Sequence, residues 1–189
     1  MKKIGIYGGT FDPIHHAHLI LGRQTCEQLG LDRLIFVPAA VSPFKSPAFA
    51  SGEQRLSMLR AAIAGQQDFA ADDCELKRPP PSYSIDTVLE IRERDPKAEL
   101  FWLIGADNVS GLNKWHRIDE LKKLVQFVVL DRGRAGKTAH QYPVVQRNID
   151  ISATEIRKRV ASGRSIRYLV PKAVEEIIRR ENLYRESGT

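Results

Sequence analysis

Two histidines near the amino terminus have the type and spacing that phosphate chemistry requires. His15 and His18 lie three residues apart at the expected start of a helix, and residues at positions i and i+3 share one helix face. Both imidazoles can therefore point toward the same ligand. Gly8 and Gly9 precede them and permit a tight turn that brings backbone close to a ligand. Because free N–H groups and the positive end of a helix dipole meet at such a turn, the segment predicts a phosphate site.

The elements on both sides of this turn must hold it in place. Residues Lys3 to Tyr7 are mostly apolar and include β-branched side chains, as in a buried strand. We expect Pro13 to open the following helix, where its missing N–H costs little. Gly30 should end that helix just after Leu29. The turn would then lie between the carboxyl end of a strand and the amino end of a helix.

Two other interpretations of the histidines stay open at this point. They are ordinary polar residues on a solvated first turn, or they belong to a zinc site. A structural zinc needs about four ligands, usually Cys or His, and Cys26 and Cys74 are single residues far apart in sequence. The pattern therefore favours phosphate over zinc, and we predict no metal-ligating side chains.

The run from Gly8 to His18 resembles the H-x-G-H signature of a nucleotidyltransferase superfamily, and more closely that of the bacterial nicotinate-nucleotide adenylyltransferases. The resemblance implies that His15 and His18 stabilise phosphates and the charge that develops during the reaction. Ala17 stands where the signature usually has glycine, so we expect its methyl group to crowd the nucleotide slightly. The ATP contacts that the resemblance implies in this run are Gly8, Gly9, Thr10, Phe11, His15 and His18.

A second motif lies near the carboxyl end of the chain. Ser152 is followed three residues later by Glu155, a capping box that predicts a helix start. The hydroxyls of Ser152 and Thr154, the free N–H groups and Arg157 one turn later can form another anion cradle. The segment resembles the family's second signature, Ser-x-Thr-x-Ile-Arg. This resemblance implies ATP contacts from Ile151, Ser152, Thr154 and Arg157.

Apolar runs that alternate with helical patterns predict the fold. Buried strands are expected at Leu34–Val37, Leu100–Ile104 and Phe127–Leu130, with shorter strands at Cys74–Lys77 and near Ile149–Ile151. Together with the resemblance, this order predicts an α/β protein: a doubly wound, Rossmann-like parallel sheet with helices on both faces.

Two segments that follow strands are expected to contact ATP. Gly105 and Asp107 come directly after a buried strand, and doubly wound sheets bind ligands at the carboxyl ends of strands. Asp107 can cap a helix, or hold a ribose hydroxyl or a metal; the resemblance favours nucleotide contact. Lys45 lies in the loop 39–50. It is either a solvated surface lysine or, as the resemblance implies, a contact to the phosphates of both substrates.

The resemblance places the nicotinate pocket at the start of a helix. Ser84 follows Tyr83 and is a plausible N-cap. Backbone N–H groups near Thr87 would face the nicotinate carboxylate. The resemblance thus implies mononucleotide contacts from Tyr83, Ser84 and Thr87.

Three further residues complete the implied mononucleotide site. Trp115 has charged neighbours, among them His116, so we expect a partly exposed ring that can stack on a heterocycle. The resemblance places the nicotinate ring on Trp115, next to His116. It also places Arg132, directly after a strand, near the mononucleotide phosphate.

Composition limits the remaining choices. The 189 residues predict one domain, 1–189, with a small helical part from about residue 150 to 189. The sequence contains no long apolar run for a membrane span, and two cysteines cannot form a disulfide framework, which fits the cytoplasm. The net charge of +6 suits a phosphate-rich substrate as well as a nucleic acid. No zinc knuckle, RNA-recognition signature or Lys/Arg tract supports a nucleic-acid partner.

The function implied by the resemblance is adenylyl transfer from ATP to nicotinate mononucleotide, giving nicotinate adenine dinucleotide and pyrophosphate. Mg²⁺ is expected, bound mainly through substrate phosphates and water, and a homodimer is allowed. The alternatives are adenylyl or cytidylyl transfer to another phosphate, such as phosphopantetheine or glycerol phosphate, and a basic nucleic-acid-binding module.

Overall fold

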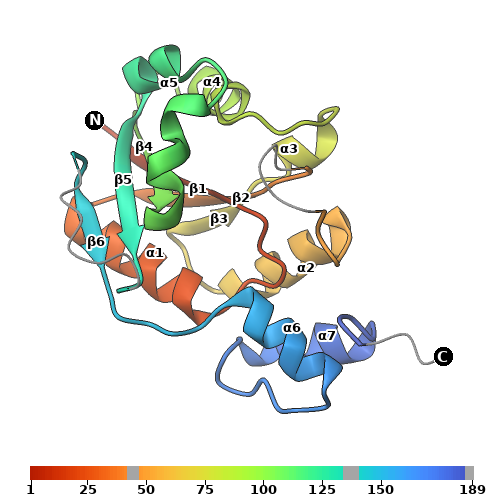
Figure 1. Cartoon of the computed structure of the whole chain (residues 1–189). Helices are drawn as coiled ribbons and strands as arrows, with labels where there is room; N and C mark the ends of the chain where they lie inside the picture. Colours follow the sequence, from red (N-terminus) through yellow and green to blue (C-terminus); the bar gives the residue numbers. More distant parts are fainter. Residues whose placement is uncertain (42–46, 134–140, 186–189) are drawn as a thin grey trace.

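A single parallel sheet forms the centre of the protein. The computed structural model describes residues 1–41, 47–133 and 141–185, and in it six strands pair in the order β3-β2-β1-β4-β5-β6 (Figure 1). The strands are β1 (Lys3–Gly9), β2 (Arg33–Pro38), β3 (Phe69–Ala71), β4 (Glu99–Gly105), β5 (Gln126–Asp131) and β6 (Val144–Gln146). This order confirms the predicted doubly wound fold. The direction of winding reverses between β1 and β4, so a ligand cleft is expected at their carboxyl ends.

Helices cover both faces of the sheet (Figure 1). α1, α2, α6 and α7 lie on one face, and α3, α4 and α5 on the other. Their bounds are α1 (His16–Leu29), α2 (Gly52–Ile63), α3 (Cys74–Lys77), α4 (Ser84–Arg94), α5 (Ile118–Leu124), α6 (Ala153–Ala161) and α7 (Lys172–Arg180), with the 3₁₀ helix η1 (Ala106–Lys114) after β4. Within the described ranges, none of these helices is long and apolar enough to span a membrane.

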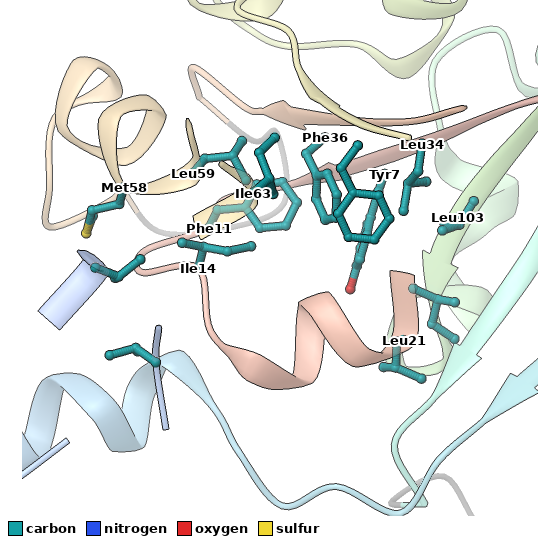
Figure 2. Packing of buried hydrophobic residues seen from close by; sticks show 14 of the residues in the cluster. Tyr7, Phe11, Ile14, Leu21, Leu34, Phe36, Met58, Leu59, Ile63 and Leu103 are labelled. Atoms are coloured by element: carbon teal, nitrogen blue, oxygen red, sulfur yellow. The ribbon is translucent and has the colours of Figure 1, made fainter. Parts of the chain in front are cut away.

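Alternating side chains of the strands build two hydrophobic clusters, one on each face. In β2, Leu34 and Phe36 belong to the cluster under α1 and α2, whereas Ile35 and Val37 belong to the opposite one. This is the period-two pattern of a sheet buried on both sides. Figure 2 shows the first cluster, in which Tyr7, Leu34 and Phe36 of the sheet lie among residues from α1 and α2. The carboxyl-terminal helices α6 and α7 contribute buried residues to the same cluster.

Two predicted strands are wrong. Cys74–Lys77 forms the short helix α3, while Phe69–Ala71 is the strand that pairs with β2. The carboxylate of Asp72 accepts the N–H of Cys74 (3.0 Å), which starts a helical turn at that point. Ile149–Ile151 has no strand structure, and the last strand is Val144–Gln146, paired with β5.

Helix starts differ from the prediction by one to three residues. Pro13 does not open α1: it lies in a turn after a cis peptide bond from Asp12, and the helix begins at His16 with His15 as its N-cap. Tyr83, and not Ser84, is the N-cap of α4. Gly30 ends α1 as predicted, in the left-handed conformation (φ 62°) that glycine adopts readily.

Candidate active site

Two cavities meet at the turn after β1, where the winding of the sheet reverses. They share lining residues Gly8, Gly9, Thr10, Gly105 and Asn108. The histidine pocket is further lined by Tyr7, Phe11, Asp12, His15, His18, Leu21, Pro47, Ala48, Phe49, Asp107, Leu130, Arg132, Ser152, Ala153, Thr154 and Arg157. The aromatic pocket is further lined by Ala39, Glu75, Ser82, Tyr83, Ser84, Trp102, Leu103, Ile104, Trp115 and His116. Two ligands bound side by side would therefore meet at Gly8–Thr10.

The start of α1 brings the two predicted histidines together. Their rings stack with centroids 3.7 Å apart and planes 18° from parallel. The backbone N–H of His15 donates to Nδ1 of His18 (3.3 Å), which sets the orientation of the second ring. The ring of Phe11 meets His18 edge-on at 5.1 Å between centroids. Both imidazoles are thus held in the lining of the pocket by their surroundings.

His15 is a neutral side chain in this environment. It is 1% exposed, and burial together with the positive charge of Arg132 lowers the pKa of His15 to about 3. Within the described part of the chain, its Nδ1 has no hydrogen-bond partner. This nitrogen is itself shielded from solvent, so a ligand in the pocket would have to contact another atom of the ring. A neutral imidazole can give that ligand one N–H or accept one hydrogen bond.

The glycines of the turn also leave room for neighbouring side chains of the protein itself. A Cβ atom on Gly8 would lie 3.0 Å from the Trp102 ring, and one on Gly9 would lie 3.0 Å from the Phe11 ring. Phe11 reaches this position with a left-handed backbone (φ 48°), which is uncommon for a residue with a side chain. The sequence suggested that the glycines serve close approach to a ligand; the structure shows that they also admit two aromatic rings.

The second motif lies across the histidine pocket, at the start of α6. Ser152 caps this helix as predicted, with its hydroxyl accepting the N–H of Glu155 (3.2 Å). Nη1 of Arg157 donates to the backbone carbonyl of Asp12 (2.6 Å), and its Nη2 donates to the hydroxyl of Thr154 (3.3 Å). The two predicted motifs, which lie at opposite ends of the sequence, therefore touch one another.

Four residues of the middle segments that were expected to contact the mononucleotide line the aromatic pocket. The rings of Tyr83 and His116 lie 4.4 Å apart at a tilt of 32°. Trp115 is half-buried and meets the ring of Trp102 edge-on at 6.2 Å. Ser84 is the first residue of α4, so free amides of this helix start face the same region.

Thr87 lies beneath the pocket and does not line it. The residue is completely buried, and its N–H is directed to the Tyr83 carbonyl (3.4 Å). Its hydroxyl donates to Oε1 of Glu75 (2.7 Å) and accepts from Arg78 (2.6 Å). A carboxylate in the pocket would thus meet amides that precede Thr87 in α4. Sequence reasoning missed Glu75, whose buried carboxyl lines the pocket and whose pKa burial raises.

Other predicted residues occupy several places. Arg132 lines the histidine pocket, and its Nη1 donates to the backbone carbonyl of Ile151 (3.1 Å). Ile151 itself does not line the pocket. Asp107 is exposed at the pocket and accepts from Asn108 (3.1 Å). Ala17 is fully buried and absent from the pocket lining, so the expected crowding of the nucleotide has no support. Lys45 lies outside the described residues.

A buried arginine near the turn gave no signal in the sequence. Arg55 on α2 is 2% exposed and donates to the backbone carbonyls of Ala50 (3.2 Å), Thr10 (2.8 Å) and Ala39 (2.8 Å). It thereby ties the turn to two neighbouring loop segments. Arginine on a helix is usually exposed, so only the three-dimensional arrangement of these carbonyls identifies its role.

No protein cage for a metal is present in the ranges that the structure describes. Searching them finds no group of three or more His, Cys, Asp and Glu side chains that could hold a metal ion. The histidine pocket has two carboxylates in its lining, those of Asp12 and Asp107. The Asp12 carboxylate is engaged by backbone and side-chain donors of the protein itself.

Comparisons with known proteins agree with this geometry. A family model described as cytidylyltransferase-like matches residues 6–159. A protein of Exiguobacterium sibiricum named as a probable nicotinate-nucleotide adenylyltransferase is 42% identical over 190 residues, covering 96% of this chain and 98% of its own. A protein of Shouchella clausii with the same name is 43% identical over 193 residues, covering all of both chains.

A solved structure supports the same fold. Nicotinic acid mononucleotide adenylyltransferase of Plasmodium falciparum, complexed with NaAD, superposes with a TM-score of 0.81. It is 20% identical in sequence, and the match covers 97% of this chain and 98% of that one. The cytidylyltransferase-like match over most of the chain and the full-length relatives lead to one conclusion: the chain belongs to the nicotinate-nucleotide adenylyltransferase family of nucleotidyltransferases.

Proposed function

We propose that this protein transfers the adenylyl group of ATP to nicotinate mononucleotide, as a step of NAD biosynthesis. The observation that carries the proposal is the pair of adjoining cavities that share the turn Gly8–Thr10, because a reaction that joins two nucleotides needs two neighbouring sites. The full-length relatives bear the name of this activity. An oxygen of the mononucleotide phosphate attacks the α-phosphorus of ATP. The bond from the α-phosphorus to the bridging oxygen breaks, and pyrophosphate leaves.

In this proposal the histidine pocket holds ATP and carries the chemistry. Transfer of this kind depends on positioning and charge stabilisation and needs no protein nucleophile. His15 and His18 donate to phosphate oxygens, and Arg157 offers the planar fork that suits a phosphate. The proposed ATP contacts are Gly8, Gly9, Thr10, Phe11, His15, His18, Lys45, Gly105, Asp107, Ile151, Ser152, Thr154 and Arg157.

The aromatic pocket holds the mononucleotide. Trp115 stacks on the nicotinate ring, and the amides at the start of α4 receive its carboxylate, helped by the helix dipole. Tyr83, Ser84 and His116 complete the wall, with Thr87 as support from below. Arg132 lies beside His15 in the other pocket, so it meets the mononucleotide phosphate only where the two ligands join. Lys45 is proposed to reach the same phosphates.

Mg²⁺ is proposed as the metal of the reaction. Such a cation keeps most of its waters and would bind through substrate phosphates. When bound, it would supply positive charge that offsets the charge of the triphosphate. We further propose a single domain over 1–189, because α6 and α7 share the hydrophobic cluster of α1 and α2. The two free, buried cysteines fit a cytoplasmic location.

Isotope labelling tests the proposed reaction. Nicotinate mononucleotide labelled with ¹⁸O in its phosphate is incubated with ATP, Mg²⁺ and the protein, and the products are identified by mass spectrometry. We expect nicotinate adenine dinucleotide that retains the label and pyrophosphate that contains none, because the attacking oxygen comes from the mononucleotide. Label in pyrophosphate, or no dinucleotide at all, would contradict the proposal.

A further inference from the structure

A buried carboxylate connects the carboxyl-terminal segment to the turn after β1. Asp12 is 4% exposed. Its Oδ2 accepts the N–H of Phe49 (2.7 Å), and its Oδ1 accepts the N–H of Ala50 (3.2 Å) and the hydroxyl of Tyr184 (2.7 Å). Tyr184 lies 172 residues away in sequence, beyond α7. Three donors from two distant segments thus fix one side chain of the turn that lines the histidine pocket.

Phe49 and Arg157 depend on the same residue. Phe49 is 74% exposed, although its backbone N–H is fixed by Asp12. The guanidinium of Arg157 lies 4.6 Å from the centroid of that ring, and it also donates to the backbone carbonyl of Asp12 (2.6 Å). A cation over an aromatic face is attracted by the ring. Asp12 therefore holds both members of a pair that lines the pocket.

We propose that Tyr184 is a positioning residue for the ATP site, acting through Asp12 on Phe49 and Arg157. The inference rests on the proposed function, which places ATP in the histidine pocket. Tyr184 does not itself line the pocket; its hydroxyl donates to Asp12, and its ring packs against the hydrophobic cluster of α1 and α2. Its hydroxyl stays protonated because burial and the Asp12 charge raise the pKa of Tyr184, so it remains a donor. A hydrogen bond to a charged group is stronger than one between neutral groups.

The first test is Tyr184→Phe, which removes one hydroxyl and keeps the ring. Tyr168→Phe is the matched control, because Tyr168 is 78% exposed in the same part of the chain. We expect the KM for ATP and the Kd for ATP from calorimetry to rise at least about threefold in Tyr184→Phe, since the loosened Asp12 no longer fixes Arg157. The KM for the mononucleotide should stay within about twofold, and the control should match wild type. A lowered melting temperature with unchanged ATP constants would make Tyr184 merely structural and overturn the proposal.

A second variant tests the coupling between Tyr184 and the pair formed by Phe49 and Arg157. Phe49→Ala removes an exposed ring, so we expect a melting temperature near that of wild type and a Kd for ATP raised in the same direction. Because the two residues act on one arginine, the double variant should raise the Kd for ATP by less than the product of the two single fold-changes. If the two fold-changes in Kd simply multiply in the double variant, the coupling is contradicted. Since ATP binding is measured directly, a wild type that binds ATP but uses another acceptor would refute the proposed function and leave this test intact.

Discussion

The two pockets beside the Gly8–Thr10 turn are built in different ways. The histidine pocket is assembled from both ends of the chain: the start of α1 and the start of α6 meet where Arg157 donates to the Asp12 carbonyl. The aromatic pocket is lined by the turn and by middle segments, with the rings of Tyr83, Trp115 and His116 in its wall. The first pocket is rich in hydrogen-bond donors, and the second offers flat rings beside a helix start.

This difference indicates that the histidine pocket serves the reaction and the aromatic pocket serves recognition of the acceptor. Imidazoles, hydroxyls and a guanidinium suit phosphates, and the triphosphate of ATP is the same whichever acceptor is used. Aromatic rings and α4 amides suit a planar ring with a negatively charged substituent. Changes in the histidine pocket should therefore lower the rate for all acceptors, whereas changes in the aromatic pocket should alter the choice among them.

The largest effect is expected from His18→Ala. Removal of a preorganised charge stabiliser typically lowers kcat by ~100-fold or more, and the half-buried position of His18 should let the fold survive. Turnover and circular dichroism are measured on the same preparation. His16→Ala is the control, because His16 is on the same helix turn but outside both pockets. Near-normal turnover of a folded His18→Ala protein would remove this side chain from the chemistry.

The choice of acid over amide probes the second pocket. Nicotinate mononucleotide should exceed nicotinamide mononucleotide in kcat/KM by roughly tenfold or more, because an amide would set an N–H donor against the amides of α4, and one such mismatch costs ~1–3 kcal/mol. Steady-state kinetics with both compounds measure the ratio. Equal values would refute the assignment of α4 to the carboxylate, while adenylyl transfer itself would stand.

A moderate effect is expected from Trp115→Ala. Loss of stacking worth ~1–3 kcal/mol should raise the KM for the mononucleotide by about tenfold, with a smaller change for ATP. Trp115→Phe keeps a flat face and should lie nearer to wild type. Because Trp115 also packs edge-on against Trp102, thermal melts must accompany the kinetics. A change confined to ATP, or loss of the fold, would place Trp115 in the core and not in recognition.

The smallest effect concerns the charge of His15, and it is expected in the pH dependence of stability. Its pKa is lowered from 6.5 to about 3 in the folded protein, so the unfolded chain binds this proton at higher pH than the folded one. Its contribution to stability is fully present above about pH 6.5 and is lost as pH falls toward 3, by at most about 1.4 kcal/mol per pH unit. An NMR titration of the His15 ring, with urea-unfolded protein as reference, measures this. Titration near pH 6.5 in the folded protein would contradict it.

The sequence predicted those features that local patterns determine. The strands of the sheet centre are long apolar runs, and Gly30 and the Ser152–Glu155 box are local signals for helix ends. Short segments were less certain, because four residues such as Cys74–Lys77 have no period that separates strand from helix. In the folded chain the Asp72 carboxylate accepts the N–H of Cys74, which favours a helical turn at this point.

Features that depend on distant partners could not be predicted. Arg55 reads as an exposed helical arginine, yet three backbone carbonyls from separate segments surround it. Asp12 reads as part of a motif, and only the folded chain shows that Tyr184 bonds to it. Thr87 was expected at the ligand, but the carboxyl of Glu75 holds it beneath the pocket. Long-range hydrogen bonds of this kind leave no spacing in the sequence.

The most direct measurement of the central claim is pyrophosphate release with ATP, Mg²⁺ and a panel of acceptors. The panel contains nicotinate mononucleotide, nicotinamide mononucleotide, phosphopantetheine and glycerol phosphate, each tested with wild type and with Trp115→Ala. We expect nicotinate mononucleotide to give the highest kcat/KM, and Trp115→Ala to reduce that value while leaving the low rates of the non-aromatic acceptors unchanged. Faster pyrophosphate release with phosphopantetheine or glycerol phosphate would contradict the proposed division between the two pockets and the choice of acceptor.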